Sequence, residues 1–259
     1  MFSAFFKELF KYELVLKQLI WQQLTLRYRR TALGFFWTLL NPLLTMVVTS
    51  VVFAMIMKWP LKSFAIFLFS GLVPYTLFSG CVAQGMQALI NSESLIKKIH
   101  VPKQIFVISV CVGLLVDAFF STVCLFIIAL AIGAPFSWSL LIVPLNFILL
   151  FGFGLGLALM LSIATVSFRD LPNVTGVVLQ AGYYLTPIIY PITAVPEQYK
   201  WMFALNPMTL FVDIFRNPIY LGQLASGDTY LKVALLAIIS MIMGIYVFKR
   251  NERFVVFKL

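Results

Sequence analysis

Long apolar stretches without a charged residue alternate along the chain with short segments that carry its charges. Residues 31–57 contain no charged residue, and roughly 20 apolar residues in a helix are enough to cross a bilayer core. The same pattern predicts five further spans, at residues 64–85, 105–132, 140–166, 174–192 and 230–248. The sequence therefore predicts an all-α integral membrane protein with six transmembrane helices.

The first 30 residues follow a different pattern, because apolar and polar positions repeat there with the period of a helix. The apolar set is Phe5, Leu9, Tyr12, Leu16, Ile20 and Leu24, and the polar set is Lys7, Lys11, Gln18, Gln22 and Arg29. We expect residues 1–30 to form an amphipathic helix in the membrane interface, with its apolar side toward lipid. Packing of that side on the protein itself is the alternative.

Composition supports a membrane protein and argues against nucleic acid as a partner. The chain is 62% hydrophobic and 11% charged, whereas soluble domains carry about 25% charged residues. The net charge of +10 comes from cations that cluster beside the apolar stretches rather than on one basic face. Such clusters are typical of orientation signals.

The distribution of Lys and Arg predicts the orientation. If the N-terminus is cytoplasmic, only five of the 19 cations fall outside, and these are Lys58, Lys62, Lys200, Arg216 and Lys232. Cytoplasmic segments of membrane proteins carry the excess of Lys and Arg. We therefore expect both termini in the cytoplasm, an N-in/C-in topology.

The segment between spans five and six holds two short apolar stretches separated by Asn206 and Pro207. Asn as the N-cap and Pro as the first helical residue are a strong signal for the start of a helix. Each stretch is too short to span a bilayer. We expect two short re-entrant helices here, and two helices on the membrane surface are the alternative.

The connection between spans two and three predicts a short amphipathic helix within residues 91–102. Asn91 and Ser92 are capping candidates, and Glu93 lies in the first turn. An apolar patch of Leu95, Ile96 and Ile99 is flanked by Lys97, Lys98 and His100. Apolar anchors inside a charged rim are typical of a helix that docks on a partner, although a simple turn at the membrane surface is also compatible.

Several kinds of chemistry are disfavoured. The chain has no G-x-x-x-x-G-K-[ST] loop, and His100 is its single histidine, so we expect neither an ATPase nor a metalloenzyme. Cys81, Cys111 and Cys124 lie in apolar stretches and are read as buried hydrophobic residues. Asp117 is the sole acid inside a predicted span; we favour a structural role for it over a proton relay.

Two groups inside the spans have a more definite interpretation. Gly152, Gly154 and Gly156 permit close contact between helices. Tyr183, Tyr184 and Tyr190, together with two prolines, predict a kinked fifth span that carries aromatic hydroxyls. These aromatic residues suit either the C–H faces and hydroxyls of sugars or an interfacial belt.

Four motifs together resemble the ABC exporter permeases for polysaccharides, in particular those for O-antigen, capsule or teichoic-acid chains. The signature R-x-[TS]-x-L-G-x-x-W-x-x-x-x-P is matched by Arg29, Thr31, Leu33, Gly34, Trp37 and Pro42. The other motifs are "FRDLPN" (168–173), "YLTPIIYP" (184–191) and "LNPMTLFVDIFRN" (205–217). The resemblance covers essentially the whole chain in the expected order.

This resemblance implies a non-catalytic permease domain at residues 31–259 in a bacterial cytoplasmic (inner) membrane. It implies a homodimer that works with two copies of a separate ATPase subunit, which binds ATP and magnesium; this chain needs no cofactor. The substrate would be a lipid-linked polysaccharide. A permease for drugs or small lipids is the nearest alternative, and an integral-membrane glycosyl- or acyltransferase or a structural scaffold is further away.

The resemblance also implies site residues. Residues 91–102 would be the helix that receives the ATPase stroke, through Ser92, Glu93, Leu95, Ile96, Lys97, Ile99 and His100. Residues 195–217 would form periplasmic gate helices, with Trp201, Asn206, Pro207, Phe211 and Phe215. The channel candidates are Phe36, Trp37, Tyr183, Tyr184 and Tyr190. Arg27, Arg29 and Arg30 are candidates for the phosphate-bearing headgroup, since Arg binds phosphate oxygens bidentately, or they serve orientation alone.

Overall fold

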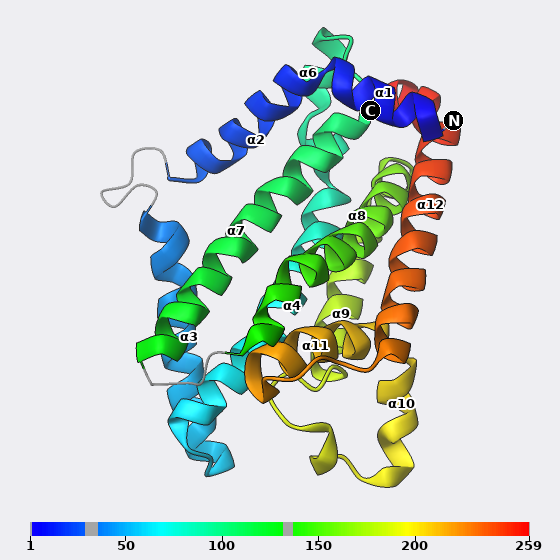
Figure 1. Ribbon diagram of the computed structural model, residues 1–259. Helices are drawn as coiled ribbons and strands as arrows, with labels where there is room; N and C mark the ends of the chain where they lie inside the picture. Colours follow the sequence, from blue (N-terminus) through cyan, green and yellow to red (C-terminus); the bar gives the residue numbers. More distant parts are fainter. Residues whose placement is uncertain (1, 29–35, 132–136, 259) are drawn as a thin grey trace.

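The structure is a computed structural model that describes residues 2–28, 36–131 and 137–258 (Figure 1). Within these ranges the chain is helical and has no strand. The α-helices are α1 (Phe2–Lys11), α2 (Glu13–Tyr28), α3 (Trp37–Met57), α4 (Leu61–Gly85), α5 (Ala88–Asn91), α6 (Glu93–Lys98), α7 (Gln104–Ala131), α8 (Val143–Ser167), α9 (Leu171–Tyr184), α10 (Lys200–Leu205), α11 (Pro207–Arg216) and α12 (Gly227–Lys258). Short turns complete them: η2 (Trp138–Ile142), η3 (Ile192–Ala194), η4 (Glu197–Tyr199) and the π-helical η5 (Asn217–Leu221).

Five helices of the described ranges are long and apolar enough to cross a membrane, and they are α3, α4, α7, α8 together with η2, and α12. They form one bundle (Figure 1). Both termini lie at one end of the bundle with α1 and α6, and we call this the terminal end. The short helices α10 and α11 lie toward the opposite end, which we call the far end.

The predicted fifth span is shorter than expected. Its helix, α9, ends at Tyr184 instead of continuing with a kink to residue 192. Its 14 residues measure about 21 Å, less than the roughly 30 Å of a bilayer core. The cause is Pro187, which disfavours helical geometry at Thr186. The Thr186 hydroxyl instead donates to the Gly182 carbonyl at 2.7 Å in the last turn.

The closest contact in the bundle joins α8 and α12. A Cβ atom added to Gly156 would lie 2.4 Å from the Ser240 carbonyl oxygen, and one added to Gly244 would lie 2.4 Å from the Gly156 carbonyl oxygen. The Ser240 hydroxyl also donates to the Phe153 carbonyl at 2.9 Å. The expected role in close helix packing is therefore confirmed for Gly156. A Cβ atom at Gly154 would lie 3.2 Å from that of Cys81, whereas one at Gly152 would make only an ordinary contact of 3.9 Å.

The N-terminal segment forms two helices rather than one, with a break at Tyr12. The apolar side that we expected to face lipid packs on the protein, because Phe5 is buried and Leu9 and Leu16 contact the core. Helix α1 contacts α12, and α2 contacts α7. A second apolar set is exposed instead, and it consists of Phe6, Phe10, Leu14 and Trp21. The segment thus presents apolar side chains on two sides.

Candidate functional site

The chain between α9 and α10 is held at the far end by a buried arginine. Arg216, the last residue of α11, is 8% exposed. Its Nη1 donates to the Pro187 carbonyl at 2.6 Å, and its Nη2 donates to the Ile188 carbonyl at 3.2 Å. A long contact of 3.5 Å joins Nη2 to the Phe67 carbonyl of α4. We call Arg216 and these three carbonyls the Arg216 clamp.

Helix α4 lies against this guanidinium, which also has Asp213 and Tyr220 nearby. The guanidinium centre lies 3.9 Å from the centroid of the Phe67 ring, a favourable cation–π distance. A Cβ atom at Gly71 would lie 2.7 Å from Nη2. A side chain at position 71 would thus force the guanidinium to shift, and the arginine joins α4, α11 and the segment after α9.

Asn206 connects α9 and α11 in a second way. Its side-chain oxygen accepts from the Met208 amide at 3.0 Å, so it caps α11 as the sequence predicts, with Pro207 as the first residue. Its Nδ2 donates to the Thr186 hydroxyl at 2.8 Å and to the Leu185 carbonyl at 3.2 Å. One amide side chain thus starts α11 and fixes the end of α9.

The expected gate aromatics lie in two different environments. Phe211 and Phe215 of α11 are fully buried, and their ring centroids lie 4.9 Å from those of Phe153 and Phe147 of α8 respectively. They anchor α11 on the bundle and are not available to a ligand. Trp201 of α10 is 60% exposed.

Tyrosines gather where α9 meets α4. The Tyr75 hydroxyl donates to the Leu179 carbonyl, and the Tyr75 ring lies 5.3 Å from Tyr183. Tyr184 packs edge-on against Tyr183 at 5.4 Å and is 60% exposed. The Tyr190 hydroxyl, in the non-helical segment, donates to the Tyr184 carbonyl. Tyr184 is consequently the most exposed aromatic side chain of this group, since Tyr183 and Tyr190 are half-buried.

The short helix α6 presents the predicted patch at the terminal end. Ile96 is buried and holds the helix on the bundle, while Leu95 and Ile99 are exposed. Lys97 and Glu93 form an exposed ion pair at 2.6 Å, and the hydrogen bond from Lys97 lowers the pKa of Glu93. Lys98 and His100 are also exposed. The helix therefore offers two apolar side chains beside cations, as an anchor for a partner requires.

A polar cluster at the terminal end fixes α1 to the bundle. Lys249 of α12 lies 2.6 Å from the Glu8 carboxylate and 3.2 Å from that of Glu252. The Lys103 ammonium donates to the Glu252 carbonyl at 2.8 Å, and burial lowers the pKa of Lys103. Gln104 donates to the Phe5 carbonyl at 3.0 Å. We call this group the Lys249 cluster.

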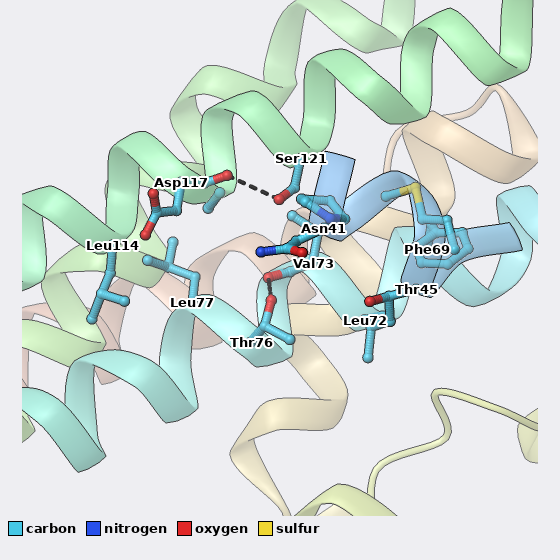
Figure 2. A pocket seen from close by; sticks show the side chains of 13 residues that line it. Asn41, Thr45, Phe69, Leu72, Val73, Thr76, Leu77, Leu114, Asp117 and Ser121 are labelled. Carbon is cyan, nitrogen blue, oxygen red and sulfur yellow. Dashed lines mark hydrogen bonds between the residues drawn. The ribbon is translucent and has the colours of Figure 1, made fainter. Parts of the chain in front are cut away.

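A cavity of about 280 Å³ lies between α3, α4 and α7. Asn41, Thr76, Asp117 and Ser121 line it from these three helices, among mostly apolar neighbours (Figure 2). The Ser121 hydroxyl donates to the Asp117 backbone carbonyl at 2.9 Å. Asp117 thus lies inside the bundle, in a cavity that polar residues of α3 and α4 also line.

The headgroup and channel candidates near the start of α3 are described only in part. Arg29 and Arg30 lie outside the described residues, and of Arg27 only the backbone is described, within α2. Phe36 directly precedes α3 and is 54% exposed, and Trp37 begins the helix and is half-buried.

Sequence reasoning missed the residues that tie a short segment to the long helices at each end of the bundle. Arg216 was counted only as an outside charge and Lys249 only as an inside charge, and Tyr75 was not singled out. A charged residue at the end of a buried apolar helix, as in "LFVDIF" followed by Arg216, is the signal that could have found the clamp.

Comparisons with known proteins bear on the whole chain. The family model described as ABC-2 type transporter matches residues 15–220. A protein of Myxococcus xanthus named O-antigen export system permease protein RfbA is 29% identical over 251 residues, which cover 96% of each chain.

Two further relatives are more distant. A protein of Klebsiella pneumoniae, also named O-antigen export system permease protein RfbA, is 25% identical over 76% of this chain and 78% of its own. A protein of Escherichia coli named polysialic acid transport protein KpsM is 22% identical over 93% of this chain and 94% of its own.

Proposed function

The chain belongs to the family of ABC-2 type transporters, and we propose that it is the membrane subunit of an ATP-driven exporter of lipid-linked polysaccharide. The observation that carries the proposal is the match, over 96% of both chains, to a permease named for O-antigen export. A relative named for polysialic acid transport points to the same class of substrate. In this role the chain is not an enzyme, and a separate subunit binds ATP and magnesium.

The arrangement of the helices supports six crossings with both termini in the cytoplasm. The described ranges hold five full-length helices, an odd number, yet both ends of the chain lie at the same end of the bundle (Figure 1). The return crossing is then made by α9 together with residues 185–191. Helices α10 and α11 dip back from the periplasmic side, and the terminal end faces the cytoplasm of a bacterium across its inner membrane. The excess of Lys and Arg at the terminal end agrees with this orientation.

The assembly is a homodimer of this chain bound to two ATPase subunits. Helices α3 and α9 carry exposed apolar side chains, among them Val48, Val52, Val178 and Tyr184. In the dimer these faces enclose the path, where Phe36, Trp37 and Tyr184 meet the glycan. Helix α6 contacts the ATPase subunit through Leu95 and Ile99 and transmits its conformational change to the permease. Arg27, Arg29 and Arg30 hold the phosphate-bearing headgroup at the cytoplasmic side.

Reconstitution in vesicles with the ATPase encoded beside it tests this function. We expect ATP-dependent movement of a defined lipid-linked polysaccharide. Introducing Leu95→Asp together with Ile99→Asp should abolish ATPase stimulation, since two buried carboxylates disrupt an apolar anchor. Ser94→Asp, at an exposed polar position of the same helix α6, is the control and should retain stimulation. Transport of small drugs without any movement of the glycan would contradict the proposal.

A further inference from the structure

A second cavity of about 280 Å³ lies at the terminal end between α2, the α4–α5 run and α7. Its polar lining consists mainly of amides and hydroxyls, and includes Gln22, Gln23, Gln84, Gln87, Asn91 and Ser109. We call it the amide pocket. None of the described residues that line it is charged, although 19 cations occur in the chain. Such a lining suits a ligand part that is rich in hydrogen-bonding groups and neutral.

The hydrogen-bond donors and acceptors of the pocket further restrict the chemical groups that its ligand can carry. An amide has two donors and an acceptor, and a hydroxyl has both kinds, although Ser109 and Gln87 each already donate to a backbone carbonyl, of Phe106 and Ala83 respectively. Within the described chain, the side chains of Gln23 and Asn91 have no hydrogen bond to protein. Leu19, Ala88 and Val110 add apolar surface to the same pocket. Hydroxyls and an acetamido group around C–H faces fit this mixture.

The size and position of the pocket point to one sugar unit beside the lipid headgroup. Its volume is at the lower limit of the roughly 300–1,000 Å³ found for ligand pockets, which suits one ring rather than a chain. Arg27 follows Gln23 by one turn of α2, about 6 Å along the helix. The pocket also includes Ser92 and Leu95, so its occupant touches the start of α6.

From these observations we infer that the amide pocket binds the first, neutral sugar of the lipid-linked glycan. Its contact with α6 places that sugar against the helix that meets the ATPase. This inference rests on the proposed function, because the pocket is read as part of the entry site for the same substrate. It adds the chemistry of the first sugar, which is uncharged and bears hydroxyl or acetamido groups.

Binding of two probes to the permease–ATPase complex in nanodiscs tests the inference. The probes are farnesyl pyrophosphate and the same molecule carrying one N-acetylglucosamine. Wild type should bind the glycosylated probe more tightly. The double variant Gln23→Leu/Asn91→Leu should lose about 10- to 100-fold in affinity for that probe, since each lost hydrogen bond changes affinity by about threefold to tenfold. Affinity for farnesyl pyrophosphate should stay unchanged.

Gln18→Leu is the matched control, because Gln18 is exposed on α2 and lies outside the pocket. A second measurement keeps the test independent of folding defects in the double variant. Gln22→Cys introduces an accessible thiol, whereas Cys81, Cys111 and Cys124 are buried. The glycosylated probe should slow its reaction with maleimide, and farnesyl pyrophosphate should not.

Equal binding of both probes by wild type would overturn the inference, and so would equal losses for both probes in the double variant. Protection of the thiol of the Gln22→Cys variant by the ATPase alone would overturn it too, since the pocket would then be a protein interface. Failure of the proposed function has a different signature, because vesicles would then move no lipid-linked glycan although the glycosylated probe is bound.

Discussion

Each end of the bundle contains a buried cation that ties a short segment to the long helices, but the two cations have different partners. At the far end, Arg216 donates to the neutral backbone carbonyls of Pro187 and Ile188. At the terminal end, Lys249 pairs with the carboxylates of Glu8 and Glu252. The hydrogen bonds that hold the far end therefore run from a planar donor group to neutral carbonyls, with Asp213 of α11 as a nearby acid, whereas direct ion pairs hold the terminal end.

The difference predicts how each end responds to substitution. Carbonyls accept hydrogen bonds roughly along their lone pairs, and they do not lose their acceptor character with pH or salt. A guanidinium holds several donors in one rigid plane, whereas the three donors of an ammonium rotate on a flexible stem. Carboxylates attract any nearby cation, so the terminal end should tolerate a change of cation that the far end does not.

Loss of the Arg216 clamp should have the largest effect. Arg216→Met removes two strong hydrogen bonds worth about 1.5–3 kcal/mol each, so we expect a loss of about 3–5 kcal/mol in unfolding free energy. Arg216→Lys should recover less than half of it. Denaturant unfolding of the protein in detergent micelles measures both. Full recovery by Lys would show that charge rather than geometry holds the far end.

Crowding the clamp should have the next largest effect. The added Cβ of Gly71→Ala would lie 2.7 Å from Nη2 of Arg216, so the guanidinium must move, and overpacking of this kind typically costs about 1–3 kcal/mol. Gly176→Ala is the matched control, because nothing lies within 4 Å of a Cβ there. Thermal unfolding compares the two, and equal midpoints would contradict the tight fit at Gly71.

Exchange of the cation in the Lys249 cluster should matter less. We expect Lys249→Met to destabilise by about 1–3 kcal/mol, since the Glu8 and Glu252 carboxylates lose their partner. We expect Lys249→Arg to stay within about 1 kcal/mol of wild type, in contrast to Arg216→Lys at the far end. Proteolysis of the N-terminal helix is a suitable local measurement. If Lys249→Arg destabilised the protein as much as Lys249→Met, the two ends of the bundle would not differ in their tolerance of a changed cation.

We expect the smallest effect from a change in the hydrogen bonds by which Asn206 joins the end of α9 to α11. Thr186→Val removes the hydroxyl that accepts from Asn206 and donates to Gly182. The loss should be about 1 kcal/mol, because Asn206 keeps its bonds to Leu185 and Met208. Thermal unfolding of Thr186→Val should thus shift the midpoint less than Gly71→Ala. A larger shift would make Asn206, rather than Arg216, the main connection.

Local signals in the sequence were sufficient for the helices and their caps. The uncharged runs predicted the five long helices, and Asn206 with Pro207 predicted the start of α11. The same reasoning extended α9 past Pro187, because it treated the proline as a kink when the chain in fact leaves the helix at Tyr184.

The contacts between distant segments could not be predicted in this way. Arg216 and Phe67 are 149 residues apart, and Lys249 and Glu8 are 241 apart. No periodicity within one helix indicates which distant backbone or carboxylate a charged residue will meet. Burial of Phe211 and Phe215 was missed for the same reason, since it depends on α8.

The unbroken length of α12 has a mechanical consequence. Its 32 residues make a rod of about 48 Å that extends from the chain after η5 to the Lys249 cluster. Gly244 lies near the middle of this rod, where backbone meets the backbone of Gly156 without intervening side chains. Such a contact resists sliding more than tilting. If the rod pivots at this contact, a push on its arm at the terminal end would swing the arm at the far end the other way.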